Sequence, residues 1–208
     1  MARELLERLE ALYSSVVADV LDQMGHREQV MSHEIRPLYP AAKVAGYAFP
    51  VRAEETDQLS DEPYKVELAS VDAIGPGQVM VVGGAGRRAA YWGELLSTRC
   101  RARGARGAVL DGLTRDCHTI ISMSFSPADS YGRVEAVAYN VETRCGGVRV
   151  RPGDLVIGDY DGVVVIPAEV AEEAIARAEE KARAEDIVRE ELKKGIPVEE
   201  TYRKYGVI

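Results

Sequence analysis

Arg115 and Asp116 are adjacent residues whose types can do chemistry, and Glu94 precedes Arg115 with twenty residues between them. An aspartate can hold a hard cation such as Mg²⁺ directly or through water, because that ion prefers few carboxylates and keeps several waters. A neighbouring guanidinium can bind a substrate carboxylate or stabilise a developing oxyanion, and Glu94 can help to place a metal-bound water. An Arg-Asp pair in a loop is also a common structural ion pair, so the residue types alone leave both interpretations open.

The elements around these residues predict that they lie at one end of a sheet. Residues 79–82 are typical of a buried strand, the glycines at 83–86 are expected to form a turn, and a helical segment contains residues 92–96. A second apolar run at 108–110 leads into Arg115 and Asp116. Ligands of open α/β sheets bind outside the carboxyl ends of strands, and the first N–H groups of a helix can hold a small anion.

Two other interpretations of this region compete. The glycines at 83–86 are similar to a loop that binds a dinucleotide or S-adenosylmethionine, but Ala89 stands where the fingerprint has its third glycine. Cys117 and His118 are the types of a nucleophile and its base, yet adjacent residues on a strand point to opposite faces. We therefore favour the interpretation that centres on Arg115 and Asp116.

The rest of the chain alternates between strand-like and helix-like runs, which predicts an α/β fold with a mixed central sheet flanked by helices. We expect a single domain over residues 1–208 with a C-terminal helical extension at about 167–208. The acidic stretch 54–62 is expected to be a solvated loop or a flap near a cationic site. Helices are expected at 5–24 and 64–74 and from Pro167, strands at 44–51, 119–123 and 134–141, a loop at 124–133, a hairpin at 154–166, and a short helix at 198–208.

Composition limits the class of protein. The 208 residues are 46% hydrophobic, as in ordinary globular proteins, and no apolar run approaches the ~20 residues that span a bilayer. Three widely spaced cysteines form neither a disulfide framework nor a CxxC pair, which indicates a reducing cytoplasm. The net charge of −8 disfavours nucleic acid as a partner. We expect a cytoplasmic protein with neither a membrane nor a nucleic-acid partner.

Gly93-Glu94-Leu95-Leu96, the twenty-residue gap and Arg115-Asp116 together resemble a D/E-x20-R-D signature. The signature belongs to the 4-hydroxy-4-methyl-2-oxoglutarate aldolase and regulator-of-ribonuclease-activity-A-like family. Similar stretches extend the resemblance over roughly residues 10–195; they lie at 15–21, 112–116, 127–133 and 146–167.

The resemblance implies an α/β/α fold related to the swivelling phosphohistidine domain, in homotrimers or dimers of trimers with active sites between subunits. It implies Mg²⁺ or Mn²⁺ at Asp116, partly through water, with Arg115 on the 2-keto oxygen of pyruvate. The segment of Gly93, Leu95 and Leu96 would bind the substrate, the backbone amides of the two leucines holding its carboxylate. The implied activity is that of a metal-dependent pyruvate lyase on a small 2-oxo acid, by retro-aldol cleavage or oxaloacetate decarboxylation.

One departure and one alternative accompany this hypothesis. Thr119 stands where active relatives often have an acidic residue, a change expected to weaken metal binding or shift the substrate. The alternative is a non-catalytic regulator that binds a protein such as a ribonuclease. Relatives are also widely labelled menaquinone-pathway methyltransferases, and the incomplete glycine loop does not support that label. The sequence assigns no proton donor or base.

Overall fold

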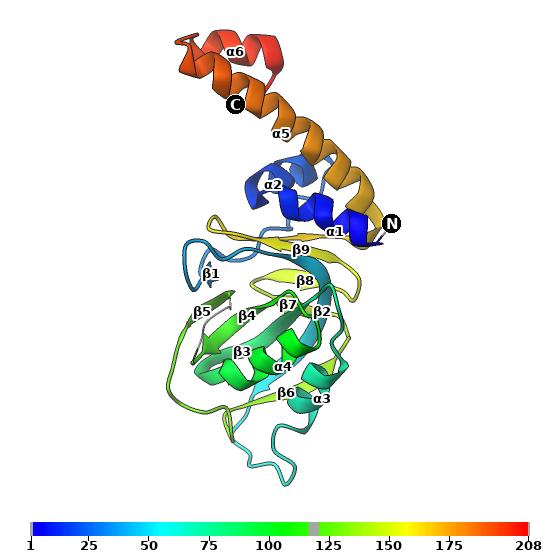
Figure 1. The fold of residues 1–208 in the computed structure, drawn as a ribbon. Helices are drawn as coiled ribbons and strands as arrows, with labels where there is room; N and C mark the ends of the chain where they lie inside the picture. Colours follow the sequence, from blue (N-terminus) through cyan, green and yellow to red (C-terminus); the bar gives the residue numbers. More distant parts are fainter. Residues whose placement is uncertain (1, 117–120, 208) are drawn as a thin grey trace.

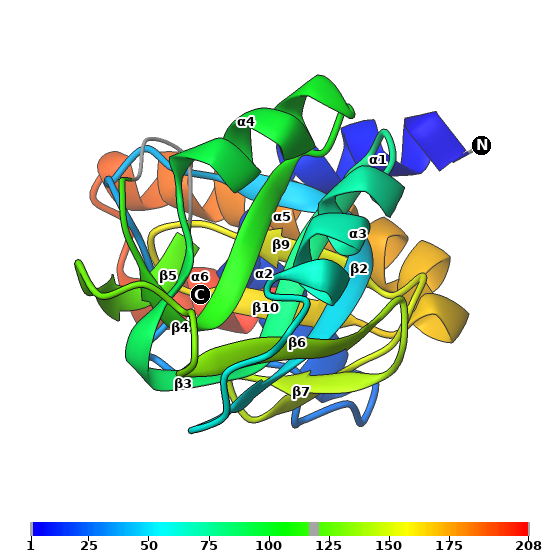
Figure 2. The same ribbon diagram turned by 90° about the horizontal axis from the view of Figure 1, so that it is seen from below.

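The computed structural model describes residues 2–116 and 121–207 and shows a mixed sheet flanked by helices (Figures 1 and 2). The fold class expected from the alternating runs is therefore confirmed. Within these residues, eight strands form one sheet. Seven of them follow the order β1-β5-β4-β3-β2-β9-β10, and the eighth, β6, pairs with the C-terminal half of β2.

Four parallel strands make the middle of the sheet, and antiparallel strands complete it. The parallel strands are β2 (Val44–Glu55), β3 (Gln78–Trp92), β4 (Gly107–Thr114) and β5 (Ile121–Phe125). The antiparallel ones are β1 (Arg36–Pro37), β6 (Val134–Tyr139), β9 (Leu155–Gly158) and β10 (Val163–Ile166). A separate hairpin joins β7 (Thr143–Cys145) to β8 (Val148–Val150).

Buried side chains alternate along β3, as a strand covered on both faces requires. Met80 and Val82 pack in the cluster that α3 (Lys65–Ala73) and α4 (Glu94–Ala102) cover. Val79 and Val81 belong to the opposite cluster, which the β7–β8 hairpin covers. β9 and β10 pack against α1 (Ala2–Ala11), α2 (Ser14–Gln23) and α5 (Ala171–Lys193).

The prediction of a turn at residues 83–86 is wrong, because β3 continues through these glycines to Trp92. Its pairing with β4 shifts register between Val82 and Gly86, so the glycines bend the strand at bulges and do not end it. Gly84 has φ +84°, and a Cβ there would lie 2.2 Å from the carbonyl oxygen of Ala53. Because no helix begins at these glycines, the structure gives a dinucleotide loop no support.

Other boundaries follow the sequence more closely. The expected 154–166 hairpin is confirmed as β9 and β10, and the helical stretch 5–24 is the pair α1 and α2. The helix after Pro167 begins with the short 3₁₀ turn η1 (Ala168–Val170) and continues as α5. β5 reaches Phe125, so it runs into the first part of the expected 124–133 loop.

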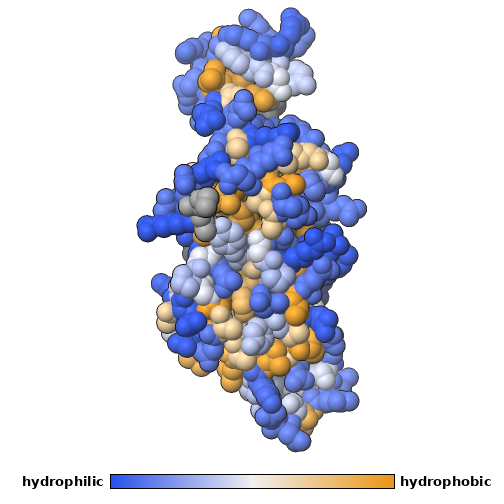
Figure 3. Space-filling view, turned by 90° about the vertical axis from the view of Figure 1, so that its right-hand side faces the viewer, coloured by the Kyte–Doolittle hydropathy of each residue, from blue (hydrophilic) through white to orange (hydrophobic). Residues whose placement is uncertain are grey.

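The C-terminal half of α5 and α6 (Val198–Tyr205) form an arm that stands clear of the sheet (Figure 1). Figure 3 shows that mainly hydrophilic residues cover this arm. Near the body, the Arg8 Nε of α1 donates to Glu179 of α5 over 2.9 Å. Toward its far end, Lys204 Nζ and Tyr205 OH donate to Glu191 over 2.9 and 2.8 Å. In the described residues, no helix is long and apolar enough to cross a membrane.

A substitution at Gly83 tests the contact between β3 and the β7–β8 hairpin. A Cβ at this position would lie 2.2 Å from the carbonyl oxygen of Arg144, so we expect Gly83→Ala to lower the free energy of unfolding by about 1–3 kcal/mol. Gly75→Ala is the matched control, because its nearest neighbour would be a Gln78 side-chain atom at 3.5 Å; we expect a change under about 1 kcal/mol. Urea unfolding followed by Trp92 fluorescence measures both, and equal stabilities would contradict this account.

Candidate active-site cleft

The ends of β3 and β4 bring the predicted residues together. Trp92 pairs with Thr114 at the end of the parallel ladder, and the Arg115 backbone N–H donates to the Trp92 carbonyl over 3.0 Å. Arg115 therefore begins just beyond the carboxyl edge of the sheet, where ligands bind in open α/β folds.

The N-terminus of α4 faces the same place. Gly93 caps the helix with an extended backbone, and the Ser97 N–H makes a hydrogen bond of 3.1 Å to the Gly93 carbonyl. The amides of residues 94–96 precede that bond, so helix geometry gives them no acceptor within α4. The Ser97 hydroxyl also donates to the Gly93 carbonyl and accepts the indole N–H of Trp92 over 2.9 Å. A buried tryptophan thus fixes the helix start, whose positive end favours an anion.

The guanidinium of Arg115 is held by a carboxylate that the sequence interpretation missed. Arg115 Nη2 lies 2.8 Å from Asp129 Oδ1, whereas Arg115 Nε is 3.8 Å from Asp116 Oδ2. The other oxygen of Asp129 accepts the hydroxyl of Tyr64 and the backbone N–H of Tyr131. Burial raises the pKa of Asp129, but these hydrogen bonds and Arg115 outweigh it and lower the pKa below its usual range. Asp129 is therefore a charged group that orients Arg115.

The Tyr64 hydroxyl takes part in the same contact. Its hydrogen bond to Asp129, together with burial, raises the pKa of Tyr64 to about 12. Tyr64 therefore remains a neutral donor to Asp129 near neutral pH.

Asp116 and Glu94 are the more exposed acids of the cleft. Asp116 has φ +54°, a left-handed conformation that aspartate tolerates better than most residues, and its side chain is 71% exposed. Glu94 Oε1 accepts the Thr98 hydroxyl over 2.6 Å. The described residues contain no group of three or more His, Cys, Asp or Glu side chains that would hold a metal ion by themselves. An exposed carboxylate beside an open cleft still fits Mg²⁺, which keeps most of its waters.

The cleft has a volume of about 360 Å³. Its walls come from the end of β3, the start of α4 and the segments after β4 and β5. The lining residues include all the predicted site residues, namely Gly93, Glu94, Leu95, Leu96, Arg115 and Asp116, together with Asp129. Their roles in catalysis, substrate binding and metal binding remain predictions. Cys117, His118 and Thr119 lie outside the described residues.

Two buried groups behind the cleft were not expected. Glu67, in the first turn of α3, is 5% exposed, and burial, aided by the charge of Asp129, raises its pKa to about 8 although Arg115 acts to lower it. Tyr91 lines the cleft, but its buried hydroxyl has no hydrogen-bond partner in the described part of the chain. Burial and the charge of Glu67 raise the pKa of Tyr91 well above its usual value. An acid in the first turn of a helix normally lies at the surface, so the residues around Glu67 carry no signal of its burial.

Fold and cleft together define a mixed α/β protein with a strand-end site suited to a small anion. A model of the RraA-like family, described as Aldolase/RraA, matches residues 14–165. The chain therefore belongs to the Aldolase/RraA family.

Relatives and solved structures agree with this assignment. A Halalkalibacterium halodurans protein named "Putative 4-hydroxy-4-methyl-2-oxoglutarate aldolase" is 29% identical over 195 residues, covering 90% of this chain and 87% of that protein. A Hahella chejuensis protein of the same name is 33% identical over 116 residues, or 51% of this chain and 69% of its own. The Streptomyces coelicolor structure of RraAS2, described as an unusual member of the RNase ES inhibitor RraA family, superposes with a TM-score of 0.82 at 28% identity. That match covers 90% of this chain and 98% of the other.

Glu67 makes stability depend on pH in a direction that can be tested. Its pKa of about 8 in the folded protein lies above the ordinary value of 4.5, so the folded state binds this proton more tightly than the unfolded state does. The resulting stabilisation is complete below pH 4.5 and is lost as pH rises to about 8. We expect Glu67→Gln to be more stable than the wild type by about 3 kcal/mol near pH ~7 and about equal to it near pH ~4.

The control is Glu135→Gln, because Glu135 lines the same cavity as Glu67 but is only half-buried. Urea unfolding at several pH values measures all three proteins, and we expect the control to follow the wild type. A stability gain for Glu67→Gln that is independent of pH would contradict a buried acid.

Proposed function

We propose that this protein is a divalent-metal-dependent lyase that cleaves a C–C bond in a small 2-oxo acid and releases pyruvate. The observation that carries the proposal is the guanidinium of Arg115, held 2.8 Å from Asp129 in a cleft that also contains a helix N-terminus and the exposed Asp116. The names of the relatives support a lyase of the aldolase type, but they say nothing of a metal or of oxaloacetate.

The chain's own residues supply two complementary anion contacts. The backbone amides of Leu95 and Leu96 would bind the substrate carboxylate, because they lie in the first turn of α4 where the helix dipole is positive. Gly93 has no side chain to obstruct this approach. Arg115 would bind the 2-keto oxygen and stabilise the negative charge that develops there as the C–C bond breaks.

The exposed acids fit a metal that is bound mostly through water. Asp116 would hold Mg²⁺ or Mn²⁺, and Glu94 would position one of its waters. When bound, such an ion acts as a Lewis acid that polarises the keto group. Asp129 is already shared by Arg115 and Tyr64, so we assign it to positioning and not to the metal.

The same site serves two substrate classes, because retro-aldol cleavage of 4-hydroxy-4-methyl-2-oxoglutarate and decarboxylation of oxaloacetate both place charge on the keto oxygen of pyruvate. We further propose a cytoplasmic homotrimer or dimer of trimers. The second candidate is a non-catalytic regulator that binds a protein, favoured by the likeness to RraAS2. Such a regulator does not require metal at Asp116.

The lyase proposal is tested by pyruvate release from both substrates with Mg²⁺, Mn²⁺ or EDTA. We expect turnover that EDTA abolishes, and a loss of about 10²–10³-fold in kcat for Arg115→Ala, because an oxyanion contact is removed. Asp116→Ala should raise the metal concentration required. Arg99→Ala is the control, because Arg99 pairs with Asp72 on the surface. If wild type and Arg115→Ala are equally inactive with every metal, the lyase proposal fails and the regulator is favoured.

Asp129→Asn tests whether the carboxylate orients Arg115. The substitution keeps the size of the side chain but removes its charge, so we expect kcat/KM to fall about 10–100-fold through misplacement of the guanidinium. Asp57→Asn is the matched control, because Asp57 pairs with Arg88 away from the cleft. Activity of Asp129→Asn equal to the wild type would contradict the positioning role.

A further inference from the structure

Glu67 occupies an unusual place for an acid in the first turn of a helix. At this position a glutamate commonly bonds back to the backbone N–H of the N-cap residue, here Tyr64. In the described part of the chain Glu67 makes no such bond, and only 5% of it is exposed. Helix capping therefore does not explain why an acid is buried here.

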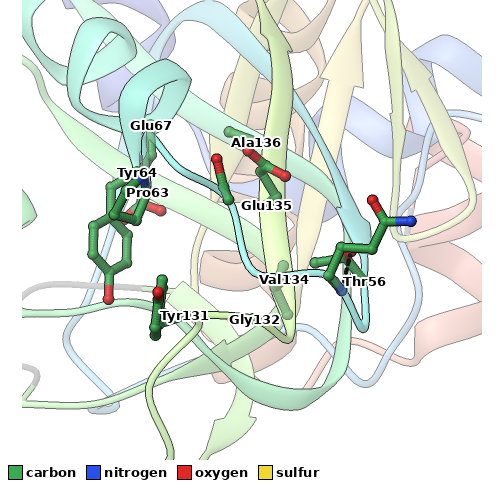
Figure 4. A pocket seen from close by; sticks show the side chains of 11 residues that line it. Thr56, Pro63, Tyr64, Glu67, Tyr131, Gly132, Val134, Glu135 and Ala136 are labelled. Carbon is green, nitrogen blue, oxygen red and sulfur yellow. Dashed lines mark hydrogen bonds between the residues drawn. The ribbon is translucent and has the colours of Figure 1, made fainter.

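Glu67 lines a cavity with Tyr64, whose hydroxyl donates to Asp129, the carboxylate that pairs with Arg115. Asp129 and Arg115 both affect its ionisation, and its own charge affects Tyr91 and Tyr64. Figure 4 shows Glu67 and Tyr64 beside Tyr131, at a cavity of about 20 Å³. A space of that size holds about one water molecule.

Titratable and charged groups face Glu67 from each element around it. They are Tyr64 before α3, Tyr91 of β3, Arg115 after β4, Asp129 and Tyr131 of the segment before β6, Glu135 of β6 and, beyond Tyr91, Cys100 of α4. Arg115 is the cation of this set. Protonation of Glu67 therefore changes the balance of charge around one guanidinium.

Arg115 already has two carboxylates near it, at 2.8 Å from Asp129 and at 3.8 Å from Asp116. An ionised Glu67 adds a third negative charge behind the cleft, where low polarity makes charge interactions stronger than in water. An anionic 2-oxo acid would then compete with three carboxylates for the same cation. An uncharged Glu67 removes one competitor.

We propose that Glu67 is a positioning residue that acts in its uncharged form, leaving Asp129 as the carboxylate that orients Arg115. Ionisation of Glu67 draws the guanidinium toward α3 and weakens the binding of an anionic substrate. The effect on substrate binding rests on the proposed lyase function, whereas the effect on Arg115 is independent of it.

The first test follows Arg115 directly and needs no substrate. The Nε–H signal of its guanidinium is recorded by NMR between about pH 6 and pH 9.5 and is assigned by its loss in Arg115→Lys. We expect the wild-type signal to move with a single ionisation near pH 8, the value to which burial raises the pKa of Glu67. In Glu67→Gln the signal should remain constant, and in Glu135→Gln it should move as in the wild type. A constant wild-type signal, or the same movement in Glu67→Gln, overturns the proposal.

The second test measures KM for the substrate that turns over best. If only the uncharged form of Glu67 supports binding, the wild-type KM rises about tenfold between about pH 7 and pH 9, in proportion to the lost fraction. We expect Glu67→Gln to change less than about twofold over this range and to match the wild-type kcat near pH ~7. Circular dichroism first shows that both proteins are folded. The pH dependence of KM is the deciding measurement, because a purely structural role of Glu67 would not alter it.

The two tests separate the two proposals. If the Arg115 signal follows Glu67 but no pyruvate is released, the lyase function fails and the positioning role stands. If pyruvate is released and the KM of Glu67→Gln rises with pH as the wild type does, the positioning role fails and the lyase function stands.

Discussion

The pairing of the last residues of β3 and β4 is the constraint on which the cleft depends. The Trp92 carbonyl accepts the backbone N–H of Arg115 and, over 3.3 Å, the hydroxyl of Thr114. The indole of the same residue bonds the Ser97 hydroxyl, which in turn bonds the start of α4. One buried tryptophan thus relates the position of Arg115 to that of the helix N-terminus. The Arg115 cation and the first-turn amides of α4 are fixed relative to each other by the backbone carbonyl and the indole of Trp92.

The charges of the cleft are ordered by their depth. Asp116 is exposed, Asp129 is partly buried and fully hydrogen-bonded, and Glu67 is buried with its pKa raised. Burial penalises a charge unless partners compensate it, so the three acids differ in character although their chemistry is the same. The exposed one suits a hydrated metal, the partnered one suits the orientation of Arg115, and the buried one suits an uncharged state.

The local sequence pattern was sufficient to predict much of the fold and the residues at the centre of the cleft. Apolar runs and Pro-Gly turns located the hairpin of β9 and β10, and the strand-end position of Arg115 followed from the run that precedes it. The course of β3 did not follow from pattern, because the glycines at 83–86 are typical of a turn when no neighbour is known. Their role depends on the carbonyl groups of Ala53 and Arg144, which approach too closely for a side chain.

The acids behind the cleft were missed for a related reason. Asp129 lies in a segment that the sequence indicates only as a loop, and Glu67 fits a common surface position of a helix. Burial is a property of tertiary packing, so the local sequence around each residue does not indicate its surroundings in the fold. The short segment that contains Thr119 lies outside the described residues, and the consequence expected from that residue stays a prediction.

In the arm formed by the C-terminal half of α5 and by α6, the two helices are held together by contacts with each other. Val188 and Thr201 are buried where the two helices meet, and Glu191 joins them through Lys204 and Tyr205. The sheet is buried against α1, α2 and the N-terminal half of α5, so it does not depend on these contacts. The arm and the sheet share one continuous helix, α5, and we expect backbone amides past the middle of α5 to exchange with solvent hydrogen sooner than those of the central strands.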